Sequence, residues 1–322
     1  MTYLNIFSHE RKTDRYYVFT EGYSHLFRLT VGVIVGDEKV LVIDSGMGMT
    51  GDLRKYIESV IGTGKPIICA VSHGSIDHAG SAMLFDERYC SIRDNWMLLT
   101  QAFKREKRLN DIAGFGLDNP EMIAYGTEHM LDSEGTQFQW IDDGHVFDLG
   151  GVEIEVIALP GHSAGSLAYF DREGKYCFTG DAINIDIQVH NLDLYYNTPE
   201  HRELLPEFLG IGVDDPKLTY GECFLKYADV VRRFISTVGE DVTLYSGHCN
   251  LPQTINTAKL IVRACEEVAA GEIESDMPAE SIFDYQKNNS GKYHRAHYAG
   301  NVCVIYDAVK FQREGIGRGA GE

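Results

Sequence analysis

The 322-residue sequence contains no C-x-x-C pair, and its seven cysteines are scattered and odd in number. Disulfide-stabilised domains instead carry an even set of cysteines that can pair with one another. The pattern therefore indicates reduced thiols rather than a disulfide framework. We expect a cytoplasmic protein on this basis.

Positive charge is also scarce, with 29 lysines and arginines against 48 acidic residues and a formal net charge of −19. A field of this sign repels phosphate backbones and anionic lipid, which disfavours nucleic acid and membrane surfaces as partners. No apolar run approaches the about 20 residues that a membrane-spanning helix needs. Residues 1–14 lack the apolar segment of a signal peptide. We expect a small-molecule substrate, and the pattern leaves a homo-oligomer open.

No linker rich in proline, glycine or serine divides the chain, and no repeat is present. Apolar residues make up 44% and charged residues 24%, as in an ordinary globular protein. The length allows one large domain or two small ones. Without a linker, we expect a single domain over 1–322, with two sheet-containing halves at about 15–150 and 151–310.

Hydrophobic patterns predict alternating strands and helices in both halves. Apolar runs predict strands at 27–35, 39–44, 67–72, 152–159, 166–170, 176–179, 242–246 and 301–307. Helical spacing predicts helices at 51–62, 95–109, 221–238 and 253–270. The stretch 110–137 is predicted as loop with a short helix, and 184–220 as irregular. Hairpins among the strands imply mixed sheets with helices packed outside them, which is an α/β (α+β) architecture.

A dense cluster of possible metal ligands follows the predicted strand 67–72. The segment Ser72-His-Gly-Ser-Ile-Asp-His-Ala-Gly80 holds two imidazoles and a carboxylate within six residues: His73, Asp77 and His78. Zinc takes nitrogen and oxygen ligands that converge from several chain segments. The sequence therefore predicts that further ligands come from elsewhere in the chain.

Three more candidates each follow a glycine at the end of an apolar strand. They are His162, Asp181 and His248. Strand ends bring side chains to one rim of a sheet, and glycine lets the backbone pack closely there. We expect all six residues to meet at that rim.

These segments resemble the metallo-β-lactamase superfamily, whose motif is H-x-H-x-D-H followed by Gly-His, Gly-Asp and Gly-His. Val42-Ile-Asp-Ser-Gly46 is similar to the early Asp-x-Gly loop of that family, and the run from Asp148 to His162 is similar to its central segment. The resemblance covers roughly residues 20–265. It implies a four-layer αβ/βα sandwich with metals at one rim of the two sheets. It also implies that Asp44 braces the metal-binding loop.

Carried over by motif position, the resemblance implies two metal sites that share one carboxylate. His73 and His162 hold metal 1, the residues Asp77, His78 and His248 hold metal 2, and Asp181 bridges. The sequence departs from the family at Ser75, where a third ligand for metal 1, usually histidine, is expected. Three interpretations follow: two metals with water in the gap, one metal at site 2, or a drift toward other chemistry or simple binding. An engineered substitution at this position is a further possibility.

The resemblance implies a metal-dependent hydrolase of a small-molecule ester, thioester or lactone, acting through hydroxide formed from water at the metal. One or two divalent ions are expected per chain, zinc first, with iron or manganese also compatible with these ligands. Asp77 is a candidate for orienting the attacking water, and His190 for a substitute ligand or acid. The alternatives are a metal-dependent lyase or isomerase on the same fold, and a binding protein with a degenerate site.

Two other motifs point to different chemistry. Gly161-x-Ser163-x-Gly165 matches the nucleophile elbow of serine hydrolases, but strand rather than helix is predicted after the serine. The glycines at 46, 48 and 51 match a dinucleotide fingerprint, but the next predicted strand ends without the acidic residue that binds a ribose. Neither motif has the structural context that its chemistry requires.

Overall fold

The computed structural model describes residues 6–23, 27–114, 120–204, 210–248, 251–279 and 294–314. The six cysteines in this part of the chain are free and buried, while Cys249 lies outside it. No helix in these ranges is both long and apolar enough to span a bilayer.

The first half of the described chain forms one seven-stranded mixed sheet, with the strands in sequence order. They are β1 (Phe7–Arg11), β2 (Tyr16–Gly22), β3 (Arg28–Val35), β4 (Val40–Ile43), β5 (Ile67–Ala70), β6 (Arg88–Cys90) and β7 (Gln139–Trp140). The strands β1 to β4 run antiparallel, and β4 to β7 run parallel. All four residues of β5 are buried, so the candidate metal loop begins inside the core.

A second sheet, with six strands within the described ranges, has the order β14-β13-β11-β10-β9-β8. Its strands are β8 (Val146–Asp148), β9 (Glu153–Ala158), β10 (Leu167–Asp171), β11 (Tyr176–Gly180), β13 (Thr243–Ser246) and β14 (Gln253–Thr254). The pairing of β11 with β13 is parallel and the other pairings are antiparallel. The carboxyl ends of β11 and β13 therefore lie at the same edge, and each is followed by a candidate ligand.

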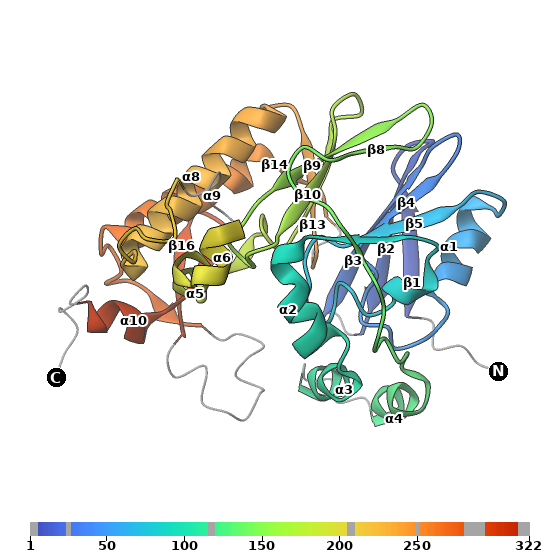
Figure 1. The fold of residues 1–322 in the computed structure, drawn as a ribbon, viewed down its shortest axis with the longest axis horizontal. Helices are drawn as coiled ribbons and strands as arrows, with labels where there is room; N and C mark the ends of the chain where they lie inside the picture. The colour runs from blue at the N-terminus through green and yellow to red at the C-terminus, as the bar shows by residue number, and fades with distance from the viewer. Residues whose placement is uncertain are drawn as a thin grey trace.

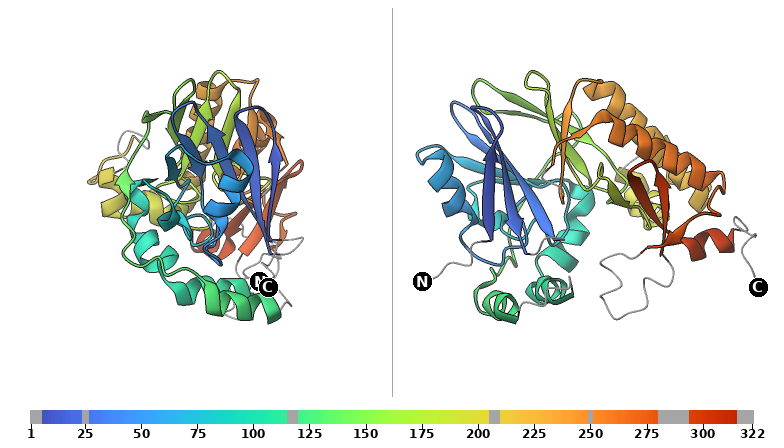
Figure 2. Two further views of the ribbon diagram at one scale, coloured as in Figure 1. Left: turned by 90° about the vertical axis from the view of Figure 1, so that its right-hand side faces the viewer. Right: turned by 180° about the vertical axis from the view of Figure 1, so that it is seen from behind.

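The two sheets pack face to face through a buried apolar layer. Leu41 and Ile43 of β4 share this layer with Val156 of β9 and Tyr169 of β10. Figure 2 shows the blue strands of the first sheet beside the green strands of the second, with the orange helices outside the latter. The sheets form the two inner layers of a sandwich.

Helices cover both outer faces. On the first sheet lie α1 (Leu53–Ile61), α3 (Arg105–Gly114) and α4 (Pro120–His129). On the second lie α8 (Tyr220–Val238) and α9 (Ile255–Ala269) (Figure 1). Thr219 and Glu222 cap the start of α8 by reciprocal hydrogen bonds. The predicted four-layer αβ/βα arrangement is confirmed.

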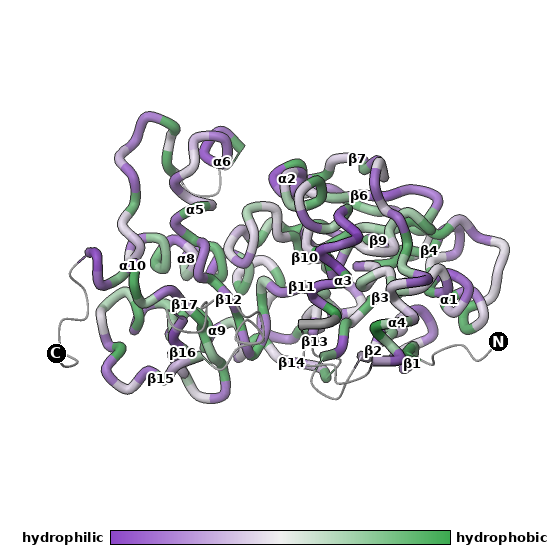
Figure 3. Tube along the Cα trace, turned by 90° about the horizontal axis from the view of Figure 1, so that it is seen from below, coloured by the Kyte–Doolittle hydropathy of each residue, from purple (hydrophilic) through white to green (hydrophobic). Residues whose placement is uncertain are grey.

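A small third sheet lies against α9 and extends the outer layer (Figure 3). In the described chain its order is β12-β17-β16-β15, with β12 (Asp186–Gln188), β15 (Met277–Pro278), β16 (His294–Ala299) and β17 (Val302–Asp307). The short strand β12 pairs in parallel with β17, and Cys303 N donates to Ile185 O at 2.7 Å. The C-terminal part of the chain thereby holds the segment that follows Asp181.

Several segments differ from the sequence prediction. The expected helix 95–109 is interrupted: α2 (Asn95–Met97) runs into a π-helical turn at Leu98–Ala102, and α3 then extends to Gly114. The expected irregular segment 184–220 contains β12 and the helices α5 (Leu192–Asn197) and α6 (Pro199–Leu204). The short helix expected in 110–137 is present as α4. A final helix, α10 (Ala308–Arg313), follows β17.

Candidate metal centre

The loop after β5 is fastened to the loop after β4 by backbone hydrogen bonds. Ser45 N donates to His78 O at 2.7 Å, and Gly80 N donates to Gly46 O at 2.9 Å. A Cβ on Gly80 would lie 2.2 Å from Met47 O, so glycine is needed for the two loops to approach. The two loops therefore act as one unit that presents His73, Asp77 and His78.

Asp44 braces this unit, as the family resemblance implies. Its Oδ1 accepts from Ser72 N at 2.6 Å, and its Oδ2 accepts from Ser72 Oγ at 2.8 Å. The same Oδ2 lies 2.8 Å from Nδ1 of His78. Asp44 has a backbone φ of 65°, in the left-handed region, which aspartate tolerates better than most residues. Its carboxylate therefore fixes both ends of the ligand loop.

The other three candidates come from strand ends in the second sheet, and the glycines before them make close contacts. A Cβ on Gly180 would lie 2.3 Å from Ser72 Oγ, and Gly180 also has a φ of +51°. A Cβ on Gly247 would lie 2.3 Å from Asp181 Oδ1 and 2.5 Å from His78 Cε1. The predicted role of glycine in allowing close packing at this rim is confirmed at both positions.

The structure brings all six predicted residues together in two groups of three. One group is His73, His162 and Asp181, and the other is Asp77, His78 and His248; within each group the potential ligand atoms lie within 4.8 Å of one another. Asp181 Oδ2 lies 3.7 Å from His162 Nε2 and 3.0 Å from His248 Nε2. Asp181 therefore stands between the groups, where a bridging ligand would be needed.

Each of three histidine rings has Nδ1 engaged, which leaves Nε2 toward the cluster. His78 Nδ1 faces Asp44, and His162 Nδ1 lies 3.1 Å from Gln188 O. His73 Nδ1 lies 3.0 Å from Ser72 Oγ, a hydroxyl that donates its own proton to Asp44. When the ring is neutral and Nδ1 donates its proton, Nε2 is unprotonated, and this is the form that binds a metal.

Buried polar atoms at the centre lack hydrogen bonds within the described part of the chain. These atoms are His73 Nε2, His78 Nε2 and Asp181 Oδ1. Burying a polar atom without a partner costs free energy, so such atoms call for another ligand. A cation between the two groups would provide one, and the nitrogen and oxygen donors fit a divalent metal.

Electrostatic attraction holds the cluster together. Burial opposes the charged form of His78, but the carboxylates of Asp44 and Asp77 outweigh it and raise the pKa of His78 well above its usual value. Burial likewise opposes ionisation of Asp181, but the imidazoles of His248 and His78 hold the pKa of Asp181 well below its usual value. The buried carboxylates thus stabilise positive charge at this place. A bound metal ion would carry that charge itself, and the imidazoles would then be neutral ligands.

Ser75 lies at the rim of the cluster and is engaged with the second group. Its Oγ donates to Asp77 Oδ1 at 2.8 Å, and its backbone carbonyl accepts from His78 N at 3.2 Å. The hydroxyl therefore orients Asp77, and the first group consists of two histidines and one aspartate.

His190 belongs to neither group of potential ligands. Its ring centroid lies 4.9 Å from that of His294 on β16. Burial, with the neighbouring His294 and His162, lowers the pKa of His190 to about 3. A role as ligand or acid stays a prediction.

The backbone of β12 is a functional feature that the sequence patterns missed. The Gln188 carbonyl orients His162, and β12 is in turn held by β17. No residue type marks such a position, because every residue offers the same backbone carbonyl group. Only the pairing of distant segments reveals it.

The serine-hydrolase interpretation is not supported. Ser163 is fully buried, its Oγ donates to Asp94 Oδ2 at 2.7 Å, and strand β10 rather than a helix follows it. The glycines that match the dinucleotide fingerprint also have a structural explanation. A Cβ on Gly48 would lie 2.4 Å from Gly80 O, so this glycine packs against the ligand loop.

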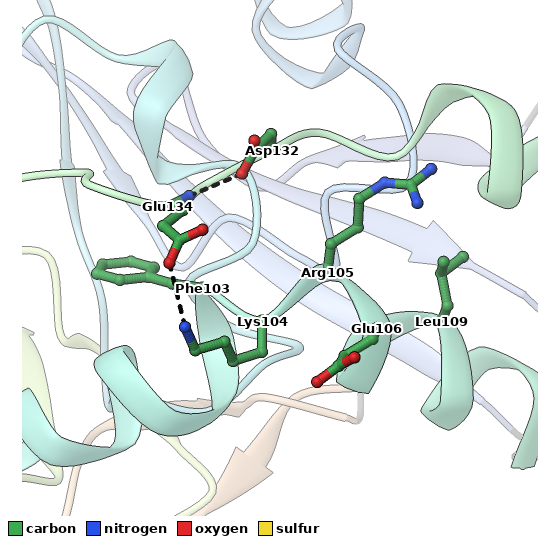
Figure 4. Close-up of a pocket in the computed structure, with 7 residues that line it drawn as sticks. All are labelled: Phe103, Lys104, Arg105, Glu106, Leu109, Asp132 and Glu134. Carbon is green, nitrogen blue, oxygen red and sulfur yellow. Dashed lines mark hydrogen bonds and ion pairs between the residues drawn. The ribbon is translucent and has the colours of Figure 1, made fainter.

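A surface cavity of about 360 Å³ lies apart from the six candidate ligands, none of which lines it. Charged residues at the start of α3, just before it and in the segment after α4 surround it (Figure 4), and one pair among them is formed by Lys104 Nζ and Glu134 Oε1, which lie 3.1 Å apart. The cavity does not share the chemistry of the metal cluster.

Comparison with known proteins agrees with the fold. Residues 98–221, which include His162 and Asp181, match the sequence model of the metallo-beta-lactamase superfamily. Two solved structures are similar over most of the chain. A beta-lactamase domain protein from Burkholderia ambifaria has a TM-score of 0.55 and 16% identity over 88% of this chain and 84% of that one. A metallo-beta-lactamase from Pontibacter korlensis has a TM-score of 0.52 and 12% identity over 81% of this chain and 99% of that one. The chain has the metallo-β-lactamase fold, and part of its sequence, residues 98–221, is similar to that superfamily.

Several relatives have names that describe an activity. The acyl-coenzyme A thioesterase MBLAC2 of Gallus gallus is 26% identical over 171 residues, covering 48% of this chain and 58% of the relative. The hydroxyacylglutathione hydrolase GloC of Haemophilus influenzae is 27% identical over 158 residues, covering 49% of this chain and 68% of the relative. The match thus spans little more than half the length of the thioesterase. Both relatives are named as hydrolytic enzymes, and both identities are low.

Proposed function

We propose that this chain is a metal-dependent hydrolase of a small-molecule ester, thioester or lactone, with thioester as the first choice. The observation that carries the proposal is the pair of facing ligand groups, with Asp181 between them and buried Nε2 atoms turned toward the centre. The thioesterase name of one relative favours a thioester among the three substrate classes.

His73, His162 and Asp181 would hold one ion, and Asp77, His78 and His248 a second, with Asp181 shared. When bound, a divalent ion polarises a carbonyl oxygen and lowers the pKa of water so that hydroxide forms near neutral pH. Histidine and carboxylate ligands suit zinc first, and iron or manganese as alternatives. Because Ser75 bonds to Asp77 and adds no donor to the first group, we propose that the first group binds its ion more weakly.

The chain's own residues supply orientation. Asp44, Ser72 and the Gln188 carbonyl fix the tautomers of the three histidines, so that each Nε2 faces the centre without rearrangement. Asp77 Oδ1 is held by Ser75, which leaves Oδ2, 3.2 Å from His248 Nε2, toward the cluster. We assign to Asp77 the orientation of water as well as a share in ion binding. We also propose His190 as a substitute ligand or acid.

The test is hydrolysis in heavy-oxygen water by the metal-loaded protein, with an acyl-coenzyme A thioester, a simple ester and a lactone as substrates. A hydrolase incorporates label into the product acid, and a chelator abolishes turnover. Asp181→Asn should lose both metal and activity, whereas Asp229→Asn, at an exposed pair with Arg232 on α8, should lose neither. Full turnover by the Asp181 variant would refute the site.

The same experiment distinguishes two alternative functions. They are considered because Ser75 weakens the ligand set of the first group. A metal-dependent lyase or isomerase would convert substrate without incorporating label. A binding protein with a degenerate site would bind a small molecule without turnover, and native-source protein would contain no metal.

A further inference from the structure

The Gly-His-Ser-Ala-Gly loop around His162 has a feature that metal binding alone leaves unexplained. Its serine and its second glycine both bond to the same buried carboxylate, that of Asp94. Asp94 ends the short 3₁₀ turn Ile92–Asp94 and is fully buried. It belongs to neither ligand group.

The same carboxylate also reaches the other ligand loop. Asp94 Oδ2 accepts from Gly74 N at 2.9 Å, and Gly74 directly follows His73. Oδ2 also accepts from Ser163 Oγ at 2.7 Å, and Oδ1 accepts from Gly165 N at 2.7 Å. Ser163 directly follows His162. One side chain thus ties together two loops that come from the two different sheets.

Close packing shows that this contact is tight. A Cβ on Gly165 would lie 2.6 Å from Asp94 Cγ, and a Cβ on Gly74 would lie 2.8 Å from Asp94 O. Real side chains almost never approach so closely, so both glycines are needed where they touch Asp94. The glycine and serine of the apparent nucleophile elbow are accounted for by this contact.

We propose that Asp94 is a positioning residue that sets the separation of His73 from His162, and with it the ion affinity of the first ligand group. The inference rests on the proposed function. Asp44 contacts His78 directly and reaches the first group only through Ser72, whereas Asp94 is the buried carboxylate that bonds to residues next to both His73 and His162. The first group depends on its brace more strongly, because it holds only two histidines and the shared Asp181.

An amide cannot replace this carboxylate. All three partners of Asp94 donate protons, two of them from backbone N–H groups on opposite oxygens. In Asp94→Asn the NH₂ group must face one of those backbone N–H groups, whichever way the amide turns. One ligand loop is then pushed from its place, while the volume of the side chain is unchanged.

The experiment is titration of the metal-stripped full-length chain with Co²⁺, followed by calorimetry and visible absorption. His162→Gln and His248→Gln identify which binding step belongs to which group. Asp94→Asn should weaken the first-group step by about 10-fold to 100-fold, the range found for residues that orient metal ligands, and should weaken the second step much less. Ser163→Ala keeps both backbone hydrogen bonds and should produce a smaller change in the same step.

Asp142→Asn is the matched control. Asp142 pairs with Arg93, the neighbour of Asp94 on the same turn, and contacts neither ligand loop by the hydrogen bonds described. It should leave both binding steps unchanged even where it lowers thermal stability. Amide hydrogen exchange should show faster exchange at residues 72–76 and 163–167 in Asp94→Asn alone.

Three results would overturn the role of Asp94: unchanged affinities in Asp94→Asn, equal loss in both steps, or a wild-type chain that binds one ion at the second group only. A wild-type chain that binds no ion at all overturns the proposed function instead. The two failures are therefore distinguishable.

Discussion

His78 Nδ1 lies 2.8 Å from Asp44 Oδ2, and both side chains are buried. This contact joins the ligand loop to the end of β4 and turns the other ring nitrogen, Nε2, toward Asp181, whose Oδ2 lies 3.6 Å away. The orientation of a candidate ligand is thus set by a residue that does not itself belong to either ligand group.

We expect Asp44→Ala to damage both folding and metal binding. It removes the acceptor of Ser72 N, Ser72 Oγ and His78 Nδ1, and an unsatisfied buried group costs about 1–3 kcal/mol. Urea unfolding of the metal-free chain should show a loss of at least this size, and metal titration a loss of about 10-fold to 100-fold. Asp229→Ala, at an exposed pair, should change stability by less than about 0.5 kcal/mol. Equal behaviour of the two variants would contradict the bracing role.

Gly247→Ala should impair metal binding without removing any ligand. The added Cβ would lie 2.3 Å from Asp181 Oδ1 and 2.5 Å from His78 Cε1, so one of these side chains must move. Metal titration should show an affinity loss of at least about tenfold. Gly51→Ala is the control, since its Cβ would meet nothing closer than Leu131 Cδ2 at 3.5 Å. Wild-type affinity in Gly247→Ala would mean that the ligands do not sit as described.

Ser75→His tests the departure from the family motif. A histidine here would add a nitrogen donor near the first group and remove the hydrogen bond to Asp77. We expect the first-group ion to bind at least about tenfold more tightly, because a third nitrogen ligand completes the set usual for zinc. Ser75→Ala, which removes only the hydrogen bond, should leave that step unchanged. Metal analysis after dialysis separates the two variants, and a histidine variant with no gain would show that position 75 does not face the first ion.

A second buried cluster, away from the metal centre, predicts a pH dependence of stability. His297 Nδ1 lies 2.7 Å from Asp276 Oδ1, and Nε2 lies 2.9 Å from Glu267 Oε2. Burial opposes the charged form of His297, but hydrogen bonds from its ring to Asp276 and Glu267 raise its pKa. A group with a raised pKa contributes full stability below its unfolded pKa of about 6.5 and loses it as pH rises through the folded pKa.

We therefore expect the wild-type chain to lose this contribution as the pH rises above about 6.5. His297→Gln cannot carry the charge, so the difference in unfolding free energy between wild type and variant should shrink over that range. Urea unfolding at several pH values measures it, and His129→Gln, an exposed position on α4, serves as control. A difference that is constant with pH would mean that His297 is uncharged in the folded chain.

Much of the site could be predicted from the sequence because its ligands obey simple positional rules. His73 follows a strand of four buried residues, and His162, Asp181 and His248 each follow a glycine at a strand end. Strand ends of packed sheets gather at one rim, so residues far apart in the sequence could be expected to meet. The mixed sheets with outer helices followed from the alternation of apolar runs, and the four-layer sandwich followed from the family resemblance.

Other parts depend on contacts that no local pattern records. Strand β1 is polar and mostly exposed, and only its pairing with β2 identifies it as a strand. Gln188 contacts His162 through its backbone carbonyl rather than its side chain. Asp94 bonds to residues that lie 20 and about 70 positions away in the sequence. Such positions become visible only when the sheets are brought together.

Diffraction from metal-soaked crystals, recorded on both sides of the metal absorption edge, tests the central claim most directly. We predict anomalous density among Asp77, His78, His248 and Asp181, with a second, weaker peak beside His73 and His162. Absence of density at both groups, or an ion bound elsewhere on the chain, would contradict the assignment of these six residues as a metal centre.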